Sequence, residues 1–327
     1  MIAFAGVCLG VLLLIGGGAF LVRGASEIAS AHGVSPMVVG LTIVGFGTSA
    51  PELVVNVIGA IHGETALAFG NVIGSNISNL GLVLGLAAII TPMTIQGNLV
   101  RRELPLLLLA TTVITVLALD GPLEGNPATI GRTDSIVLIL MFCIFIYITA
   151  HDFLRTKRID PLLIEIEEHP IAVLTSDGRM PLLLLFAGFA LLFVGGETTI
   201  RNGVALAAHF GTSPTIIGLF VVAIGTSMPE LATSIIAAMR GESDLALGNV
   251  IGSNIFNSLL VLPTSGLISQ IAVPPGGVGD LVVSWVLAAV LIPVFFIGKA
   301  RLGRTVGLIL LLAYCAYALL RILGATA

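Results

Sequence analysis

One short motif occurs twice in this chain, once in each half, and it constrains the fold more than any other feature. Residues 47–53 read GTSAPEL, and residues 225–231 read GTSMPEL. At the same offset, GNVIGSNI at 70–77 returns unchanged at 248–255. An ungapped alignment of 47–84 with 225–262 gives 24 identities. Self-similarity over this length indicates two structural repeats in one chain.

Composition places both repeats in a membrane. Hydrophobic residues make up 57% of the 327 residues and charged residues only 10%, so a fold in water would expose a large apolar surface. A helix needs about 20 apolar residues to cross a bilayer. The first apolar stretch begins almost at Met1 without a basic flank, which predicts a permanent helix rather than a removable signal. Ten stretches are suitable, near 3–22, 36–61, 66–90, 103–119, 134–151, 181–200, 214–239, 244–268, 281–297 and 305–323.

The repeat and the number of stretches together predict the topology. Each half holds five of the ten stretches, so the second copy enters the membrane from the side opposite to the first. We therefore predict an all-α membrane protein with ten transmembrane helices in two inverted five-helix repeats, 1–151 and 181–327, joined by a cytoplasmic linker at 152–180. Inverted repeats are typical of secondary transporters, whose site lies near the membrane midplane between the repeats.

The distribution of Lys and Arg between loops predicts the orientation, because cytoplasmic loops carry more of both. With the N-terminus outside, eleven of the fourteen basic residues fall in inward loops, which leaves three outside, Arg132, Arg201 and Arg321. Both termini are therefore expected on the outer, periplasmic face of a bacterial inner membrane.

Each motif carries a carboxylate inside an apolar stretch, Glu52 in the first and Glu230 in the second. A charge at this depth is costly unless it is paired, protonated or bound to a cation. A threonine four residues earlier shares the helix face of each carboxylate, and a serine follows it. These hydroxyl residues are Thr48 and Ser49, and Thr226 and Ser227.

A glycine and a proline in each motif predict an interrupted helix. Proline lacks the N–H that would bond the carbonyl four residues earlier, and its ring pushes that carbonyl aside. Irregular backbone is tolerated at membrane depth where it lines a polar cavity, and freed carbonyls can bind cations. We expect a kink in both motifs, formed by Gly47 with Pro51 and by Gly225 with Pro229.

The next helix of each repeat adds two neutral oxygen donors on one face, Ser75 with Asn79 and Ser253 with Asn257. A GxxxG pattern lets the same helix approach a neighbour closely; its glycines are Gly70, Gly74, Gly248 and Gly252. Four further asparagines are assigned to hydrogen bonds between helices, namely Asn71, Asn76, Asn249 and Asn254.

The predicted site therefore offers two carboxylates, hydroxyls, amides and freed carbonyls, without a thiolate or imidazole. Such oxygens suit hard cations such as Ca²⁺ and Na⁺, with Glu52, Glu230, Thr48 and Thr226 as metal ligands. Two negative charges neutralise one Ca²⁺ or two Na⁺, and shared ligands make their occupancy mutually exclusive, as exchange requires. Lone cysteines in apolar stretches predict buried, inert thiols, at Cys8, Cys143 and Cys315.

The doubled sequence GTSxPE followed by GNxxGSNxxN resembles the cation/calcium exchanger superfamily, especially its prokaryotic sodium/calcium exchangers. The resemblance covers the whole chain. It implies that the ten hydroxyl, carboxylate and amide residues named above surround the ions, and that Gly45 and Ala223 contribute carbonyls. It also implies that the first and sixth helices slide across a rigid core, a contact for which their glycines at 16–18, 188 and 195–196 are suited.

Asn257 departs from the pattern, because several similar sodium/calcium members carry an acidic residue at this place. The neutral side chain leaves open a calcium/proton antiporter, and potassium-dependent exchangers resemble the motif too. A cation channel is the alternative from another class. Without a Walker loop or a hydrolase motif, we expect an ion-driven transporter rather than an enzyme, with no cofactor, nucleotide or nucleic acid. We expect a monomer whose partners are the bilayer and its ions.

Overall fold

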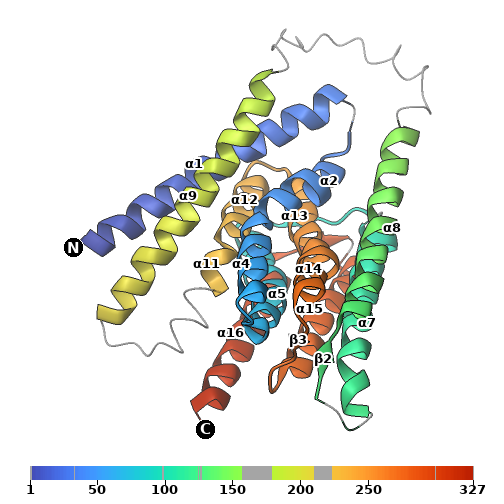
Figure 1. Ribbon diagram of the computed structural model, residues 1–327. Coiled ribbons are helices and arrows are strands. Elements are labelled where there is room, and N and C mark those ends of the chain that lie inside the picture. Colours follow the sequence, from blue (N-terminus) through green and yellow to red (C-terminus); the bar gives the residue numbers. More distant parts are fainter. Residues whose placement is uncertain are drawn as a thin grey trace, which may run out of the picture.

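The computed structural model of this protein describes residues 2–32, 34–97, 99–123, 125, 127–156, 179–209, 223–298 and 300–326, and these are mostly helical (Figure 1). The first half contains α1 (Ile2–His32), α2 (Pro36–Val39), η1 (Gly40–Val44), α3 (Gly45–Thr48), α4 (Ala50–Ile61), α5 (Thr65–Ser78), η2 (Asn79–Val83), α6 (Leu84–Ile90), η3 (Leu99–Glu103), α7 (Leu104–Leu123) and α8 (Arg132–Thr156). The segments labelled η are π-helical.

The second half contains α9 (Arg179–His209), α11 (Ala223–Thr226), α12 (Met228–Met239), α13 (Ser243–Phe256), η6 (Asn257–Val261), α14 (Leu262–Ile268), α15 (Gly277–Ile297) and α16 (Arg304–Thr326). The bounds of α4, α5, η2 and α6 recur as those of α12, α13, η6 and α14, at the same offset as the two motifs. The sequence repeat is therefore also a repeat of secondary structure, down to the π-helical turn that begins at Asn79 and at Asn257.

The described residues contain eight helices long and apolar enough to cross a membrane, or nine if a pair bent by 42°, Pro36–Thr48 with Ala50–Ile61, counts as one span. Helix α12 is apolar but shorter. The predicted number of ten is thus not reached in the part of the chain that the structure describes. The linker predicted at 152–180 lies mostly outside the described residues, and α8 continues into it as far as Thr156.

Helices α1 and α9 have 31 residues each, more than the 20 predicted for each span. At 1.5 Å per residue each is about 46 Å long, so it exceeds the ~30 Å hydrocarbon core and fits by tilting. Figure 1 shows the two helices side by side, inclined to most of the others. Their backbones come close at glycines: a Cβ at Gly17 would lie 2.8 Å from the Leu192 nitrogen, and one at Gly188 2.6 Å from the Leu21 nitrogen.

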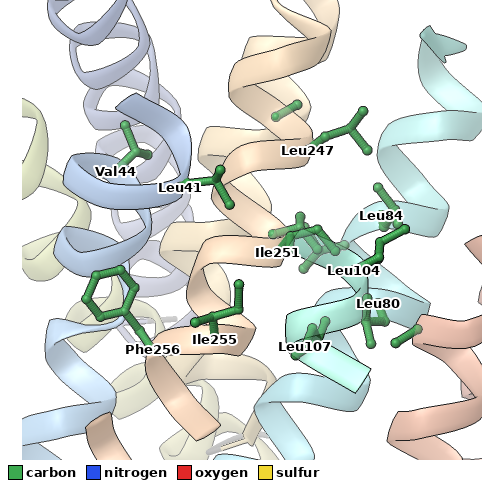
Figure 2. Close-up of a cluster of buried hydrophobic side chains, with 14 of the residues drawn as sticks. Leu41, Val44, Leu80, Leu84, Leu104, Leu107, Leu247, Ile251, Ile255 and Phe256 are labelled. Atoms are coloured by element: carbon green, nitrogen blue, oxygen red, sulfur yellow. The ribbon is translucent and has the colours of Figure 1, made fainter. Parts of the chain in front are cut away.

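Helix α13 and its continuation form the centre of the protein. In an apolar 18-residue window of the Ser243–Ile268 span 94% of the residues are buried, against 11% in such a window of the outer span Arg304–Leu323. Figure 2 shows Ile251 of α13 between Leu41 of η1 on one side and Leu84 and Leu104 on the other. Lipid tails are as apolar as these side chains, so close packing rather than escape from water holds the centre together.

Glycines allow α2 and η1 to lie directly against α13. A Cβ at Gly248 would lie 2.7 Å from the Met37 carbonyl oxygen, and one at Gly252 2.6 Å from that of Leu41. The close approach predicted for this GxxxG pattern is therefore confirmed. No such contact is present at Gly70 or Gly74 within the described part of the chain.

Two details differ from the prediction. The chain is not purely helical, because β1 (Met93–Thr94) pairs with β4 (Arg301–Leu302) and β2 (Thr129–Ile130) with β3 (Ile271–Ala272), both antiparallel. These short ladders satisfy backbone groups where helices end. The three cysteines predicted to be buried, Cys8, Cys143 and Cys315, are instead exposed on α1, α8 and α16. A thiol is apolar enough to face lipid as readily as protein.

Candidate ion-binding site

The two carboxylates occupy matching places in the fold. Glu52 lies in the first turn of α4 and Glu230 in the first turn of α12, and both side chains are fully buried, with 0% of their surface exposed. The N-terminal end of a helix carries a partial positive charge from its free N–H groups. Both acidic side chains therefore lie at the end of their helix that favours a negative charge.

Both helices begin after a one-residue break. Ser49 separates α3 from α4 with φ −84° and ψ 1°, and Ser227 separates α11 from α12 with φ −85° and ψ 6°. Pro51 and Pro229 lie in the first turns that follow. Neither proline has an N–H to give to the carbonyl four residues earlier, that of Gly47 or Gly225. The two breaks therefore fall between Gly47 and Pro51 and between Gly225 and Pro229.

The two motifs touch each other. Ser49 Oγ donates a hydrogen bond to Glu230 Oε1 at 3.3 Å, across 181 residues of sequence. A hydroxyl of the first motif therefore meets the carboxylate of the second.

A second group of oxygens gathers around Thr48. Its Oγ1 lies 3.2 Å from Ser253 Oγ on α13 and 3.4 Å from the Gly45 carbonyl oxygen. Ser253 Oγ lies 3.4 Å from that same carbonyl. The structure thus brings together three of the predicted ligands, two from the first repeat and one from the second.

The remaining predicted ligands are placed by their helices. Thr226 Oγ1 donates to Asn71 Oδ1 at 3.4 Å, and Asn79 Nδ2 donates to Asn254 Oδ1 at 3.0 Å. Ala223 begins α11. The other three are buried: Ser75 on α5, Ser227 between α11 and α12, and Asn257 on η6.

Several of these oxygens are buried without a hydrogen-bond partner. Six of the ten side chains predicted as ligands carry such an oxygen among the described residues: Glu52, Ser75, Asn79, Ser227, Glu230 and Asn257. An unsatisfied buried polar atom costs about 1–3 kcal/mol, so a cluster of them is unstable unless something binds there. A bare cation satisfies many oxygens at once, and this donor set fits Ca²⁺ or Na⁺.

The four asparagines assigned to interhelical hydrogen bonds do form them. Asn76 Nδ2 donates to Ser258 Oγ at 2.9 Å, and Asn254 Nδ2 donates to the Asn76 carbonyl at 3.2 Å. Asn71 and Asn249 bond to side chains of neighbouring helices as well.

Two of the partners, Asn56 and Ser234, were not predicted. They lie four residues after Glu52 and Glu230 and are buried, so the same i,i+4 spacing that selected the threonines could have found them.

Soft metal ligands are not assembled. No group of three or more His, Cys, Asp or Glu side chains in the described ranges could hold a metal ion. The donors that the contacts above bring together are hydroxyls, amides, the Gly45 carbonyl and the Glu230 carboxylate; Glu52 lies at the matching place of the other repeat. Such a set binds hard cations through mixed charged and neutral oxygens.

Comparison with known proteins gives a consistent family. The chain matches the family described as sodium/calcium exchanger protein over residues 2–150 and 180–323. It is 37% identical to the putative antiporter CaxA of Alkalimonas amylolytica, over 97% of this chain and 98% of that protein. It is 36% identical to the inner membrane protein YrbG of Escherichia coli (strain K12), over 84% of this chain and 82% of that protein.

A solved structure of the sodium-calcium exchanger NCX_Mj has a similar fold. The two superpose with a TM-score of 0.81 at 29% sequence identity, and the match covers 97% of each chain. Since the family match spans nearly all the described residues and the fold agrees over the same length, the chain belongs to the sodium/calcium exchanger protein family.

Proposed function

We propose that this protein is a secondary antiporter that exchanges Ca²⁺ against Na⁺ at one buried site between its two repeats. The observation that carries the proposal is the contact between the motifs: Ser49 of one donates to Glu230 of the other, among oxygens that are buried and without hydrogen-bond partners. A fold and family shared with named exchangers supports the same function.

The proposed ligands are those predicted from the sequence. Glu52 and Glu230 supply both negative charges, and the neutral oxygens complete the coordination, from Thr48, Ser49, Ser75, Asn79, Thr226, Ser227, Ser253 and Asn257 and the carbonyls of Gly45 and Ala223. Ca²⁺ takes about six to eight oxygens. A charge of −2 balances one Ca²⁺ or two Na⁺, and either load uses the same carboxylates. One ion species must therefore leave before the other binds, which couples their transport.

The membrane arrangement belongs to the proposal. Ten spanning helices in two inverted repeats, 1–151 and 181–327, would present the site alternately to the two sides. The recurrence of helix bounds at a constant offset supports this division. We place the protein in a bacterial inner membrane with both termini outside and the 152–180 linker in the cytoplasm, consistent with its similarity to YrbG and with the bias of basic residues.

Transport in proteoliposomes tests the coupling. Vesicles loaded with Na⁺ and diluted into Na⁺-free medium are expected to accumulate ⁴⁵Ca²⁺ without a pH gradient, with a protonophore present and the voltage clamped by K⁺ and valinomycin. Vesicles that contain choline instead of Na⁺ are the control. Uptake that follows only an imposed pH gradient would establish the calcium/proton alternative, and uptake without any counter-ion gradient would indicate a channel. Repeating the assay in K⁺-free media without valinomycin, where the protonophore at equal pH holds the voltage at zero, tests potassium dependence.

A further inference from the structure

Two buried asparagines each accept a hydrogen bond from the motif threonine of the opposite repeat. Thr48 Oγ1 donates to Asn249 Oδ1 on α13 at 3.1 Å, and Thr226 Oγ1 donates to Asn71 Oδ1 on α5 at 3.4 Å. Asn71 and Asn249 occupy the same place in the two repeats, as the second residue of each GNVIGSNI segment. The contacts therefore run crosswise: an asparagine of each repeat accepts a hydrogen bond from a threonine of the other.

The other end of each amide is held within its own repeat. Asn249 Nδ2 donates to Ser234 Oγ at 2.9 Å and to the Glu230 backbone carbonyl at 3.5 Å. A carbonyl can only accept, so the nitrogen of this amide must face Glu230 and the oxygen must face Thr48. In the first repeat, Asn71 Nδ2 donates to Asn56 Oδ1 at 3.3 Å.

This orientation decides which way the threonine hydroxyl points. A hydroxyl has one hydrogen and two lone pairs, and only the lone pairs bind a cation. When Thr48 gives its hydrogen to Asn249, its lone pairs remain for an ion, and Ser253 can give its own hydrogen to the Gly45 carbonyl. Asn249 is fully buried and Thr48 is 1% exposed, so bulk water is not available to replace the amide.

We propose that Asn71 and Asn249 are positioning residues that orient the ligand threonines of the opposite repeat, Asn249 for Thr48 and Asn71 for Thr226. Each asparagine holds the threonine hydrogen away from the ion and so lowers the ion concentration needed for binding. The proposal rests on the proposed function, in which both threonines bind the transported ions. It also ties the two halves of the site together, because each half is completed by an amide from the other.

Double-mutant cycles test the crosswise pairing. The readout is the KM for Ca²⁺ in Na⁺-driven ⁴⁵Ca²⁺ uptake by proteoliposomes. Loss of one ordinary hydrogen bond corresponds to about a fivefold change, so Asn249→Leu and Thr48→Val are each expected to raise KM about fivefold. The double variant Asn249→Leu with Thr48→Val is expected to stay near fivefold, because the asparagine has nothing left to orient. Asn249→Leu with Thr226→Val is the matched control, and its effects are expected to multiply to about 25-fold.

The second repeat gives the mirror experiment. Asn71→Leu is expected to leave the KM for Ca²⁺ unchanged in the Thr226→Val background. In the Thr48→Val background its effect on KM is expected to multiply with that of Thr48→Val. An asparagine that only packed helices together would lower the melting temperature and the number of active molecules, and would act equally in both backgrounds. Equal action in both backgrounds overturns the proposal.

A milder variant covers the case in which Asn249→Leu does not fold. Ser234→Ala removes the acceptor that holds the Asn249 amide. It is expected to raise KM about twofold, because a partly freed amide loses only part of the energy of one hydrogen bond. No rise is expected in the Thr48→Val background. A rise that persists in that background overturns the positioning role. If Thr48→Val and Thr226→Val leave KM unchanged, the proposed ion site itself is wrong, and that result is distinct from additive cycles.

Discussion

Glu52 and Glu230 are the two carboxylates of the proposed site, and both are fully buried. Ser49 Oγ donates to Glu230, and in the part of the chain that the structure describes no basic side chain forms a hydrogen bond or ion pair with either carboxylate. At the depth of a membrane span, such a charge is stable when a cation is bound to it. Each carboxylate therefore supplies half of the charge that would balance one Ca²⁺.

We expect Glu52→Gln or Glu230→Gln to stop exchange while the protein stays folded. Removing one partner of a buried charge interaction costs about 3–5 kcal/mol, which corresponds to a loss of about 100-fold or more. The measurements are Na⁺-driven ⁴⁵Ca²⁺ uptake and thermal melting with and without Ca²⁺. Wild-type protein at 100 times its Kd for Ca²⁺ gains about 2.7 kcal/mol of stability, and the variants are expected to lose that gain.

Glu64→Gln is the matched control for these variants, because Glu64 is a glutamate of the same repeat but exposed, just before α5. It is expected to keep exchange within about twofold, as exposed substitutions usually change little. Full exchange by either buried variant would place the site elsewhere.

The ligand types at this scale could be predicted from sequence, but most of their partners could not. Spacing within one helix selected Thr48 with Glu52, because residues four apart share a face. The contacts of Thr48 with Asn249 and of Ser49 with Glu230 join residues 201 and 181 apart in the chain. Such pairs depend on how the repeats pack together, and one sequence without its structure does not contain that information.

At the scale of single elements, the break before α4 is the feature closest to the proposed chemistry. Pro51 lies in the first turn of α4, and the helices on either side of Ser49 meet at 42°. The missing N–H leaves the Gly47 carbonyl without its usual helical partner. The bend also sets the direction in which Thr48, before it, and Glu52, after it, present their oxygens.

Pro51→Ala restores the N–H and is expected to let the helix continue through Ser49. We expect the free energy of unfolding to change little, because proline is tolerated in the first turn of a helix, and exchange to fall by about tenfold because one turn of misplacement separates the ligands. Thermal melting and ⁴⁵Ca²⁺ uptake measure the two effects. Pro293→Ala, inside the outer helix α15, is the control and is expected to leave uptake unchanged. Equal uptake in both variants would remove any role for the break.

The seam between α1 and α9 is a second element-scale feature. A Cβ at Gly17 would lie 2.8 Å from the Leu192 nitrogen, whereas no described atom lies within 4 Å of a Cβ at the adjacent Gly16. Gly17→Leu must therefore push the helices apart, at about 1–3 kcal/mol, and we expect a lower melting temperature. Gly16→Leu, its matched control, is expected to melt like the wild type. Thermal melting of the two purified variants measures the difference. Equal melting temperatures would contradict a close contact between α1 and α9 at Gly17.

At the scale of the whole molecule, the repeat predicted the bounds of the central helices, whereas the packing of the outer ones was not predictable. In lipid an apolar side chain faces protein or hydrocarbon equally well, so hydropathy does not reveal the packed face. Leu14 of α1 is 3% exposed and Leu12 is 66% exposed, although both belong to the same apolar run. The pairing of α1 with α9 and the exposure of the three cysteines were missed for this reason.

Apart from Gly16, the glycines expected to form the sliding contact divide between two surfaces. Gly17, Gly188 and Gly195 lie between α1 and α9. Gly18 instead lies near Ala232 of α12, where a Cβ would be 3.3 Å from the Ala232 carbonyl carbon, and Gly196 lies near Pro229. The first group joins α1 to α9, and the second faces the helix that carries Glu230. We therefore expect α1 and α9 to move together as one body across α12.

Disulfides placed on these two surfaces test that motion, in a background with Cys8, Cys143 and Cys315 replaced by Ala. Gly18→Cys with Ala232→Cys links α1 to α12 and is expected to stop Na⁺-driven ⁴⁵Ca²⁺ uptake when oxidised and to restore it after reduction. Gly24→Cys with Leu184→Cys links α1 to α9, since a Cβ at Gly24 would lie 3.2 Å from the Leu184 Cβ, close to the ~3.5–4.5 Å of a disulfide. This second bond joins parts that move together, so uptake is expected to continue. Loss of uptake with both bonds would mean that α1 and α9 shift against each other, and uptake with both would mean that neither crosses α12 during exchange.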